Sequence, residues 1–398
     1  MTFKLYSASC HCKRIALSVP LVPNKVQDIS LCHCDACRRT TGNSAVGAIA
    51  LPRFPLQVAT QQDDVQASRF DLSLLDKYTA GGIDRYFCPK CAAAVLFHTA
   101  PDTNEECGLA AQAKAGDIDG SGTWLLSLGL LAEKSDRSEL YSITSHVYVA
   151  DTLDGGLAKH LSSFAENTLP LYTKGPRSPL FLPEYPQIKT VKQGDRLDFH
   201  CHCGSVKFSI DTLIAPTEDP SEWWARPAGD SSVCPPLPTV LADGETHIKH
   251  LAGYCVCNDC RASSGHLITS WSFVSREKLR VCDQALEEPL SEESVKNAAN
   301  TLSIYASSSL GRRAFCSTCG ARAFDWSADR VRGDGMECVG ICLGLVDTCQ
   351  SGGLVGSPWF DWFPVVYQAS SATDQRVVDP LLAGLTGQMS QTVEEEKA

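Results

Sequence analysis

The sequence predicts a mostly β protein built from two tandem domains with short helices, and two observations carry this prediction. One pattern of cysteines, C-x-C, then C-x-C-x-x-C, then C-x-x-C, occurs twice in the same order, starting at Cys10 and at Cys201. Short apolar and β-branched segments dominate both copies, whereas helical signals are few. A chain of 398 residues that is 43% hydrophobic is long enough to bury two such cores.

The two copies set the expected domain boundaries. We expect a first domain over 1–173, a Pro-rich connector over 174–195 and a second domain over 196–385. The second domain carries an insertion near 215–247, which contains Trp223 and Trp224 and is typical of a packed surface loop. The polar stretch 386–398 predicts a disordered tail.

Within the domains, strands are predicted at matching places, over 15–19, 45–51, 206–210 and 267–273. The longest apolar run, 124–132, is roughly half the length needed to cross a bilayer, so it predicts a buried strand. The clearest helix is expected over 291–299 with Ser291 as its N-cap, and a weaker one over 154–164.

The composition and the start of the chain indicate the cellular compartment in which the 20 cysteines act. The chain starts without an apolar segment followed by a small-residue cleavage site, which predicts an intracellular, cytoplasmic protein with no membrane partner. In a reducing compartment, clustered cysteines are metal ligands far more often than disulfides. The net charge of −11 has the wrong sign for binding phosphates, so nucleic acid is not an expected partner.

The outer cysteines of each copy predict a closed structural zinc site. On a strand, Cys10 and Cys12 would point to the same face, and a C-x-x-C turn would supply two more sulfurs. Four thiolates complete a tetrahedron and replace core that a small β domain lacks. The predicted ligand sets are Cys10, Cys12, Cys88 and Cys91, and then Cys201, Cys203, Cys316 and Cys319.

The middle cysteines of each copy predict a second kind of zinc site. They are Cys32, Cys34 and Cys37 (the first triplet) and Cys255, Cys257 and Cys260 (the second triplet). Three thiolates leave one tetrahedral position open, which is the mark of a catalytic or ligand-binding zinc. A soft exogenous thiolate is the expected fourth ligand, and about four zinc ions per chain are expected in all.

A fourth ligand from the protein is the alternative for each triplet. The candidates are Cys107, Cys234, Cys282, Cys338, Cys342, Cys349, His98 and His266. None of these cysteines recurs at matching places in both copies, which favours open sites. The six extra cysteines are then interpreted as small buried hydrophobes.

The segments around these cysteines resemble the family of glutathione-dependent formaldehyde-activating enzymes and centromere protein V. They are Ser9-Cys10-His11-Cys12, Cys32-His33-Cys34-Asp35-Ala36-Cys37-Arg38 and Arg85-Tyr86-Phe87-Cys88 in the first copy, and Cys201-His202-Cys203-Gly204 and Arg313-Ala314-Phe315-Cys316 in the second. The resemblance implies a β-tent fold in each half, a structural zinc and a second zinc that meets the thiol of glutathione. The reaction it implies is reversible carbon–sulfur bond formation between formaldehyde and glutathione.

Two departures and one recurrence qualify the resemblance. Val256 stands where the family often places histidine, and alanines follow Cys91 where the family continues Gly-Thr, so one half is expected to bind substrate and the other to serve architecture. Arg38 and Arg261 follow the two triplets, where a guanidinium would offset the zinc–thiolate charge or grip a substrate carboxylate. The alternative is an arginine whose stem covers apolar surface while its head stays in water.

These features predict a zinc-dependent carbon–sulfur lyase that resembles S-(hydroxymethyl)glutathione synthase and acts on glutathione or a related small thiol adduct. The alternative is a non-catalytic, zinc-stabilised module whose β surfaces bind a protein partner. The two hypotheses differ in whether the triplets keep an exchangeable position.

Overall fold

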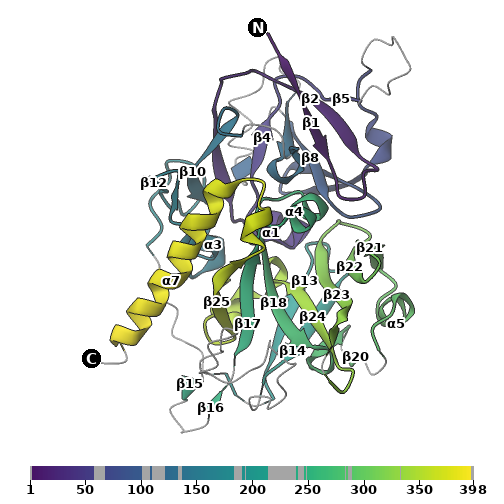
Figure 1. Ribbon diagram of the computed structural model, residues 1–398, viewed down its shortest axis with the longest axis vertical. Helices are drawn as coiled ribbons and strands as arrows, with labels where there is room; N and C mark the ends of the chain where they lie inside the picture. Colours follow the sequence, from purple (N-terminus) through teal and green to yellow (C-terminus); the bar gives the residue numbers. More distant parts are fainter. Residues whose placement is uncertain are drawn as a thin grey trace.

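Strands are the main regular elements of the chain, as the computed structural model in Figure 1 shows. The structure describes residues 2–57, 68–100, 108–109, 122–132, 137–182, 191–192, 194–213, 239–240, 246–247, 249–282, 284–285, 289–331 and 333–395. The prediction of a mostly β fold with few helices is confirmed.

The first half of the chain, before residue 174, contains three sheets and a hairpin. Its strands are β1 (Lys4–Ser9), β2 (Ala16–Leu21), β3 (Gln27–Cys32), β4 (Ala48–Ala50), β5 (Leu56–Gln57), β6 (Asp76–Ala80), β7 (Ile83–Phe87), β8 (Ala94–Thr99), β9 (Thr123–Ser127), β10 (Tyr141–Val147), β11 (Ser163–Phe164) and β12 (Asn167–Thr168). They form the sheets β1-β2-β5 and β4-β9-β8-β7-β6, the parallel pair β3-β10 and the hairpin β11-β12. Helices α1 (Asp35–Thr41) and α3 (Leu157–His160) are short.

The second half, from residue 196 on, repeats this strand order. Its strands are β13 (Arg196–His200), β14 (Lys207–Asp211), β15 (Thr239–Val240), β16 (Thr246–His247), β17 (His250–Cys255), β18 (Thr269–Ser275), β19 (Leu279–Val281), β20 (Gln284–Ala285), β21 (Leu302–Ala306), β22 (Gly311–Cys316), β23 (Arg322–Val331), β24 (Glu337–Cys342) and β25 (Phe360–Tyr367), and its helices are α4 (Asn258–Ser264), α5 (Glu292–Ala298), α6 (Thr348–Ser351) and α7 (Val378–Glu395). One sheet has the order β21-β22-β23-β24-β18-β17-β25, which matches β6-β7-β8-β9-β4 followed by β3-β10. The order in which the elements follow one another thus supports a tandem repeat.

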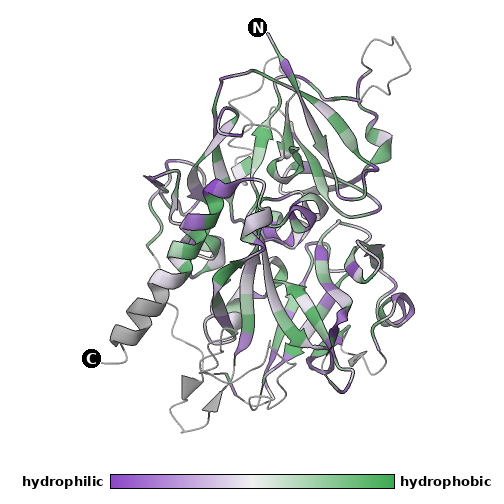
Figure 2. Ribbon diagram, in the orientation of Figure 1, coloured by the Kyte–Doolittle hydropathy of each residue, from purple (hydrophilic) through white to green (hydrophobic). Residues whose placement is uncertain are grey.

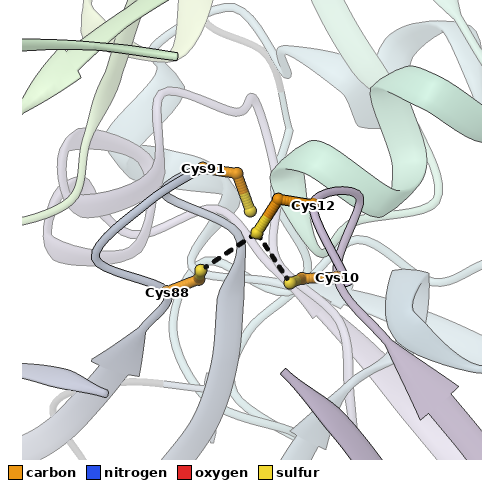
Figure 3. A group of neighbouring side chains, drawn as sticks. All are labelled: Cys10, Cys12, Cys88 and Cys91. Carbon is orange, nitrogen blue, oxygen red and sulfur yellow. Dashed lines mark hydrogen bonds between the residues drawn. The ribbon is translucent and has the colours of Figure 1, made fainter. Parts of the chain in front are cut away.

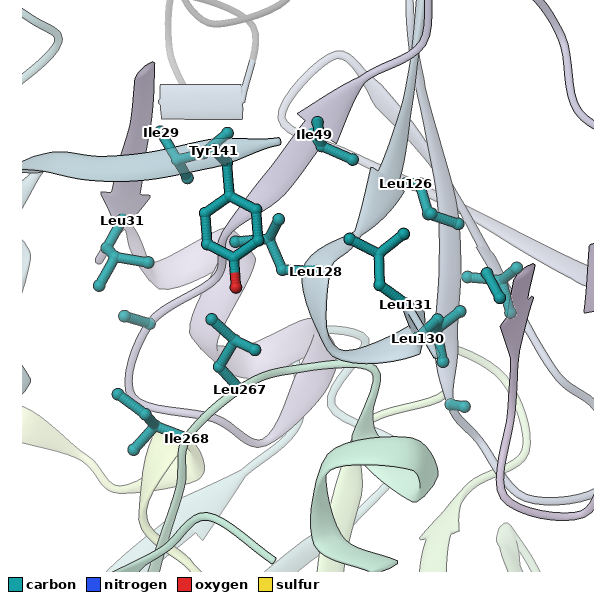
Figure 4. Close-up of a cluster of buried hydrophobic side chains, with 14 of the residues drawn as sticks. Ile29, Leu31, Ile49, Leu126, Leu128, Leu130, Leu131, Tyr141, Leu267 and Ile268 are labelled. Atoms are coloured by element: carbon teal, nitrogen blue, oxygen red, sulfur yellow. The ribbon is translucent and has the colours of Figure 1, made fainter. Parts of the chain in front are cut away.

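One of the hydrophobic clusters of the described residues contains side chains of both halves. Along β2 the side chains of Leu17, Val19 and Leu21 are buried, and apolar residues line the strands in both halves (Figure 2). Leu267 and Ile268 of the second half lie in the same cluster as leucines and isoleucines of the first half (Figure 4). Burying this apolar surface between the halves favours their association, while each half also keeps a cluster of its own.

The structure agrees with the stronger helix prediction and corrects the weaker one. Helix α5 begins after Ser291, whose side chain accepts the Ser294 N–H in a capping box. Within 154–164 only Leu157–His160 is helical, and the chain then enters β11, because two glycines precede the helix and the hairpin β11-β12 follows it. The apolar run 124–132 is strand up to Ser127 and then a 3₁₀ turn, η2 (Leu128–Leu130).

Helix α7 corrects the predicted disordered tail. It runs from Val378 to Glu395 and therefore continues through the boundary expected at 385. Its first turns lie against β25 and α3, with Leu381 and Leu385 buried on one face (Figure 1). Packing of this face against the rest of the chain stabilises the first turns of the helix.

The predicted insertion near 215–247, including Trp223 and Trp224, lies outside the described residues apart from the short strands β15 and β16. Part of the predicted connector, 183–190 and 193, also lies outside them. Of the helices in the described part of the chain, none combines the length and apolar character needed to cross a membrane.

Candidate metal centres

The outer cysteines of each half converge into closed clusters of four sulfurs. In the first closed cluster, Cys10 and Cys12 come from the turn between β1 and β2, and Cys88 and Cys91 from the turn between β7 and β8 (Figure 3). The Sγ atom of Cys12 lies 3.5 Å from that of Cys10 and 3.6 Å from that of Cys88. The edge of a tetrahedron with zinc–sulfur bonds of about 2.3 Å is about 3.8 Å, so the spacing fits one shared ion.

The second closed cluster has the same geometry. Cys203 Sγ lies 3.4 Å from Cys201 Sγ and 3.5 Å from Cys316 Sγ, and Cys319 completes the group. The first two cysteines of each cluster lie in turns, which corrects the expectation that they alternate along a strand. The turn places both sulfurs on one side because the chain reverses there, with Gly204 at a φ of +74°.

Four thiols this close oppose one another's ionisation. Hydrogen bonding to Cys316 raises the pKa of Cys201 to about 12, and the same contact lowers the pKa of Cys316 to about 2. Hydrogen bonding likewise raises the pKa of Cys10 and lowers the pKa of Cys12. All four sulfurs can be thiolates together only when a cation offsets their charge, and this donor set suits zinc.

Each triplet is assembled at the junction between a strand and a short helix. Cys32 ends β3, Cys34 caps α1 by accepting the Cys37 N–H at 3.4 Å, and Cys37 lies in the first turn of α1. The Sγ atoms of Cys32 and Cys34 are 3.4 Å apart, and Cys32 Sγ also accepts the Gly108 N–H at 3.3 Å. The second triplet repeats this arrangement at the junction of β17 and α4, where Cys257 caps the helix.

Among the described residues, no fourth Cys, His, Asp or Glu side chain joins either triplet. Cys338 and Cys342 are buried in the same apolar cluster as Cys255 and Cys260 but do not belong to the ligand group. Cys282 and Cys349 are exposed, whereas Cys107 and Cys234 lie outside the described residues. The open position predicted for each triplet is therefore consistent with the described side chains.

A buried arginine contacts the last sulfur of each triplet, and neither arginine was among the residues predicted for the sites. The Arg85 guanidinium donates to Cys37 Sγ at 3.6 Å, and that of Arg313 donates to Cys260 Sγ at 3.8 Å through both terminal nitrogens. Each arginine precedes the C-x-x-C pair of its own half by three residues, a recurrence that would have identified them. A cation at this sulfur offsets the negative charge of a zinc–thiolate group.

The positions of Arg38 and Arg261 fit neither of the two roles considered for them. Both side chains are buried, so neither guanidinium remains in water. Arg38 donates to Gly344 O at 3.2 Å and also to Asp35, whereas Arg261 donates to Gly129 O and, at 2.9 Å, to Leu131 O. Because Gly344 and Gly129 belong to the opposite half in each case, these arginines connect the two halves. Their hydrogen bonds therefore indicate a structural role and not a contact with substrate.

The turn between the first two cysteines of each half also contacts the triplet helix of the other half. The His11 N–H donates to Ala262 O at 3.0 Å, and His11 Nε2 lies 3.3 Å from an Asp259 carboxylate oxygen. In the mirror contact, the His202 N–H donates to Arg39 O at 2.9 Å. The turn of each closed cluster thus contacts the helix that carries the triplet of the opposite half.

His146 forms a buried pair with His33 rather than with an acidic neighbour. The two rings are joined by a hydrogen bond of 2.8 Å between His33 Nε2 and His146 Nδ1, and His146 Nε2 donates to Leu161 O at 2.7 Å. Burial lowers the pKa of His146 to about 4, so the ring is neutral near neutral pH. Val256 of the second half matches His33 of the first half in position. Each residue directly follows the first cysteine of its triplet, and each donates its backbone N–H to the neighbouring parallel strand.

A pocket of about 670 Å³ lies beside the second triplet. Cys257 is part of its wall, and most of its charged lining comes from Asp259, Arg312, Arg313, Asp325, Asp329 and Arg330. Cys257 is partly exposed, whereas all three cysteines of the first triplet are buried. A small polar ligand could therefore reach a sulfur of the second triplet.

Residues 5–124 match the family model for glutathione-dependent formaldehyde-activating enzymes. The match includes both cysteine groups of the first half and covers less than half of the chain. No curated protein and no solved structure matches the chain.

Proposed function

Because residues 5–124 carry a domain of the glutathione-dependent formaldehyde-activating family, we propose that the chain is a zinc-dependent carbon–sulfur lyase. Its substrate would be glutathione or a related small thiol, joined to formaldehyde or a similar small aldehyde. In the forward direction a carbon–sulfur bond forms between the thiol sulfur and the carbonyl carbon, and the thiol proton passes to the carbonyl oxygen. The reverse reaction breaks the same bond and returns both molecules.

The observation that carries this proposal is the pair of three-sulfur groups with no fourth ligand among the described side chains. Zinc held there would supply an open position at which a substrate thiolate is stabilised as nucleophile or leaving group. The closed clusters have no such position and are assigned to structure.

The chain's own residues would prepare the triplets for a thiol substrate. Arg85 and Arg313 each donate to one sulfur of a triplet and would offset the negative charge of a zinc ion held by three thiolates. The polar pocket beside Cys257 would hold a substrate that carries both carboxylate and ammonium groups, because both arginines and aspartates line it. The second half is therefore the better supported substrate site.

A protein-binding role is favoured by one observation in the first half. The first triplet is buried and the Gly108 backbone lies on Cys32, so a Cβ at that glycine would come within 3.1 Å of Cys32 Sγ. A zinc site enclosed in this way would serve architecture. X-ray absorption at the zinc edge separates the two roles, because a uniform four-sulfur shell with no exchangeable position would favour the protein-binding module.

We expect about four zinc ions per chain, and about one fewer when all three cysteines of one triplet are replaced by serine. Elemental analysis gives the metal count, and isotope exchange between formaldehyde and its glutathione adduct gives the turnover. Serine variants of the second triplet should abolish turnover while Cys282→Ser, at an exposed cysteine outside the ligand groups, leaves both readouts unchanged. Two zinc ions in the wild type, or turnover that survives loss of both triplets, would contradict the proposal.

A further inference from the structure

The two triplets differ in the charges buried around them. Arg85 and Arg313 occupy matching places, three residues before each C-x-x-C pair. Three residues after each pair, however, Arg322 begins β23 in the second half and Ala94 begins β8 in the first. The two positions match in space as well, because a Cβ at Gly42 would meet Arg322 O at 2.2 Å and a Cβ at Gly265 would meet Ala94 O at 2.2 Å.

The Arg322 side chain is buried, and its two terminal nitrogens have no hydrogen-bond partner among the described residues. Arg322 is 3% exposed, and the nitrogens without a partner there are Nη1 and Nη2. It lies over the Trp271 ring, 5.0 Å from the centroid, and Trp271 pairs across the sheet with Cys342. Trp271 and Cys342 belong to the apolar cluster that contains Cys255 and Cys260, so Trp271 connects this cation to the surroundings of the second triplet.

A buried cation needs a compensating anion, because an unpaired charge in a protein interior is strongly unfavourable. One divalent zinc and three thiolates leave a single negative charge, which Arg313 already offsets through Cys260. Cys342 is buried among apolar side chains and belongs to no ligand group of the described residues, so it is not expected to carry the second negative charge. Asp325 forms an ion pair with Arg330 at 3.2 Å.

The first triplet has fewer positive charges around it than the second. Ala94 brings no charge, and Asp35 accepts from Arg38 where Asn258 stands beside Arg261. In the described part of the chain, Arg85 is therefore the arginine that contacts a sulfur of the first triplet and offsets the negative charge of three thiolates and a zinc ion. A neutral fourth ligand, such as water, leaves this centre balanced.

We propose that the second triplet is the centre that takes an anionic thiolate as its fourth ligand, and that Arg322 is the residue that selects it. This inference rests on the proposed function, because it identifies which of the two centres binds the thiol. With a fourth thiolate the second centre carries two negative charges, which Arg313 and Arg322 balance. The first centre is a weak thiol site because Ala94 stands where the second half has Arg322.

The test uses the full chain with cobalt in place of zinc and 2-mercaptoethanol as the probe. Each added sulfur ligand increases the sulfur-to-cobalt charge-transfer absorption, so a titration reports thiolate binding without turnover. Wild type should show one tight binding phase. In Arg322→Met, which keeps much of the side-chain volume without the charge, that phase should weaken by about tenfold to a hundredfold. Arg322→Lys, which keeps the charge, should restore binding to within about threefold of wild type.

Arg280→Met removes a partly exposed arginine that pairs with Asp211 and should leave the tight phase unchanged. Cobalt content and far-ultraviolet circular dichroism show whether each variant is loaded and folded. If Arg322→Met does not fold, Arg322→Lys decides, because a folded, fully loaded lysine variant that loses the tight phase overturns the inference. Binding by wild type that Arg322→Met leaves unchanged overturns the inference alone. No thiol binding by wild type overturns the proposed function as well.

Discussion

Replacement of Cys316 by Ser should unfold the second half of the chain and destabilise the first. Cys316 is fully buried, and its sulfur lies 3.5 Å from that of Cys203 in the second closed cluster. The loss of one of four thiolates removes the closed zinc site, whose binding free energy is about 10 to 16 kcal/mol in small zinc-folded peptides. A whole domain is stable by only about 5 to 15 kcal/mol, so this loss exceeds what the remaining core can supply.

The measurement is thermal unfolding followed by circular dichroism, with zinc counted by elemental analysis. The control is Cys349→Ser, which removes an exposed cysteine of the same half that belongs to no ligand group among the described residues. Its unfolding temperature and zinc content should equal those of the wild type. A Cys316→Ser protein that keeps the wild-type zinc count and unfolds at the wild-type temperature would show that the four sulfurs do not share an ion.

The ligand groups could be predicted from the sequence because their spacing is local. A C-x-C turn and a C-x-x-C turn each bring two sulfurs together within a few residues, and only the pairing of turns is long-range. The repetition of the pattern at Cys10 and Cys201 also made the tandem organisation and the mostly β class predictable. The helices that carry the triplets were missed, although Gly42 and Gly265 end them in the left-handed conformation typical of a helix C-terminus.

The roles of the arginines could not be predicted, since their partners are distant in sequence. Arg38 donates to Gly344 O across 306 residues, and no local pattern indicates that contact. Both roles considered for Arg38 assumed a separate domain with the guanidinium near substrate or water. The docking of one half on the other buried it instead, and only tertiary structure reveals this.

Docking of the two halves also depends on Gly42, and Gly42→Ala should lower the free energy of unfolding by about 2 to 4 kcal/mol. Gly42 ends α1 at a φ of +78°, where alanine costs about 1 kcal/mol in backbone strain. A Cβ there would also lie 2.2 Å from Arg322 O, a backbone atom of the opposite half that cannot rotate away. The halves would have to separate, which would weaken the hydrogen bond from the Gly344 N–H to Gly42 O.

Chemical denaturation measures this loss, and Gly335→Ala is the matched control. Gly335 has a φ of +87°, and no described atom lies within 4 Å of where an alanine methyl group would be, so alanine there should cost only the strain of about 1 kcal/mol. The difference between the two variants isolates the contact between the halves from the backbone conformation. Equal losses would mean that α1 and β23 do not meet as closely as the structure places them. A larger loss for Gly42→Ala, together with weaker metal retention at both triplets, is the result expected if each half holds the triplet helix of the other in place.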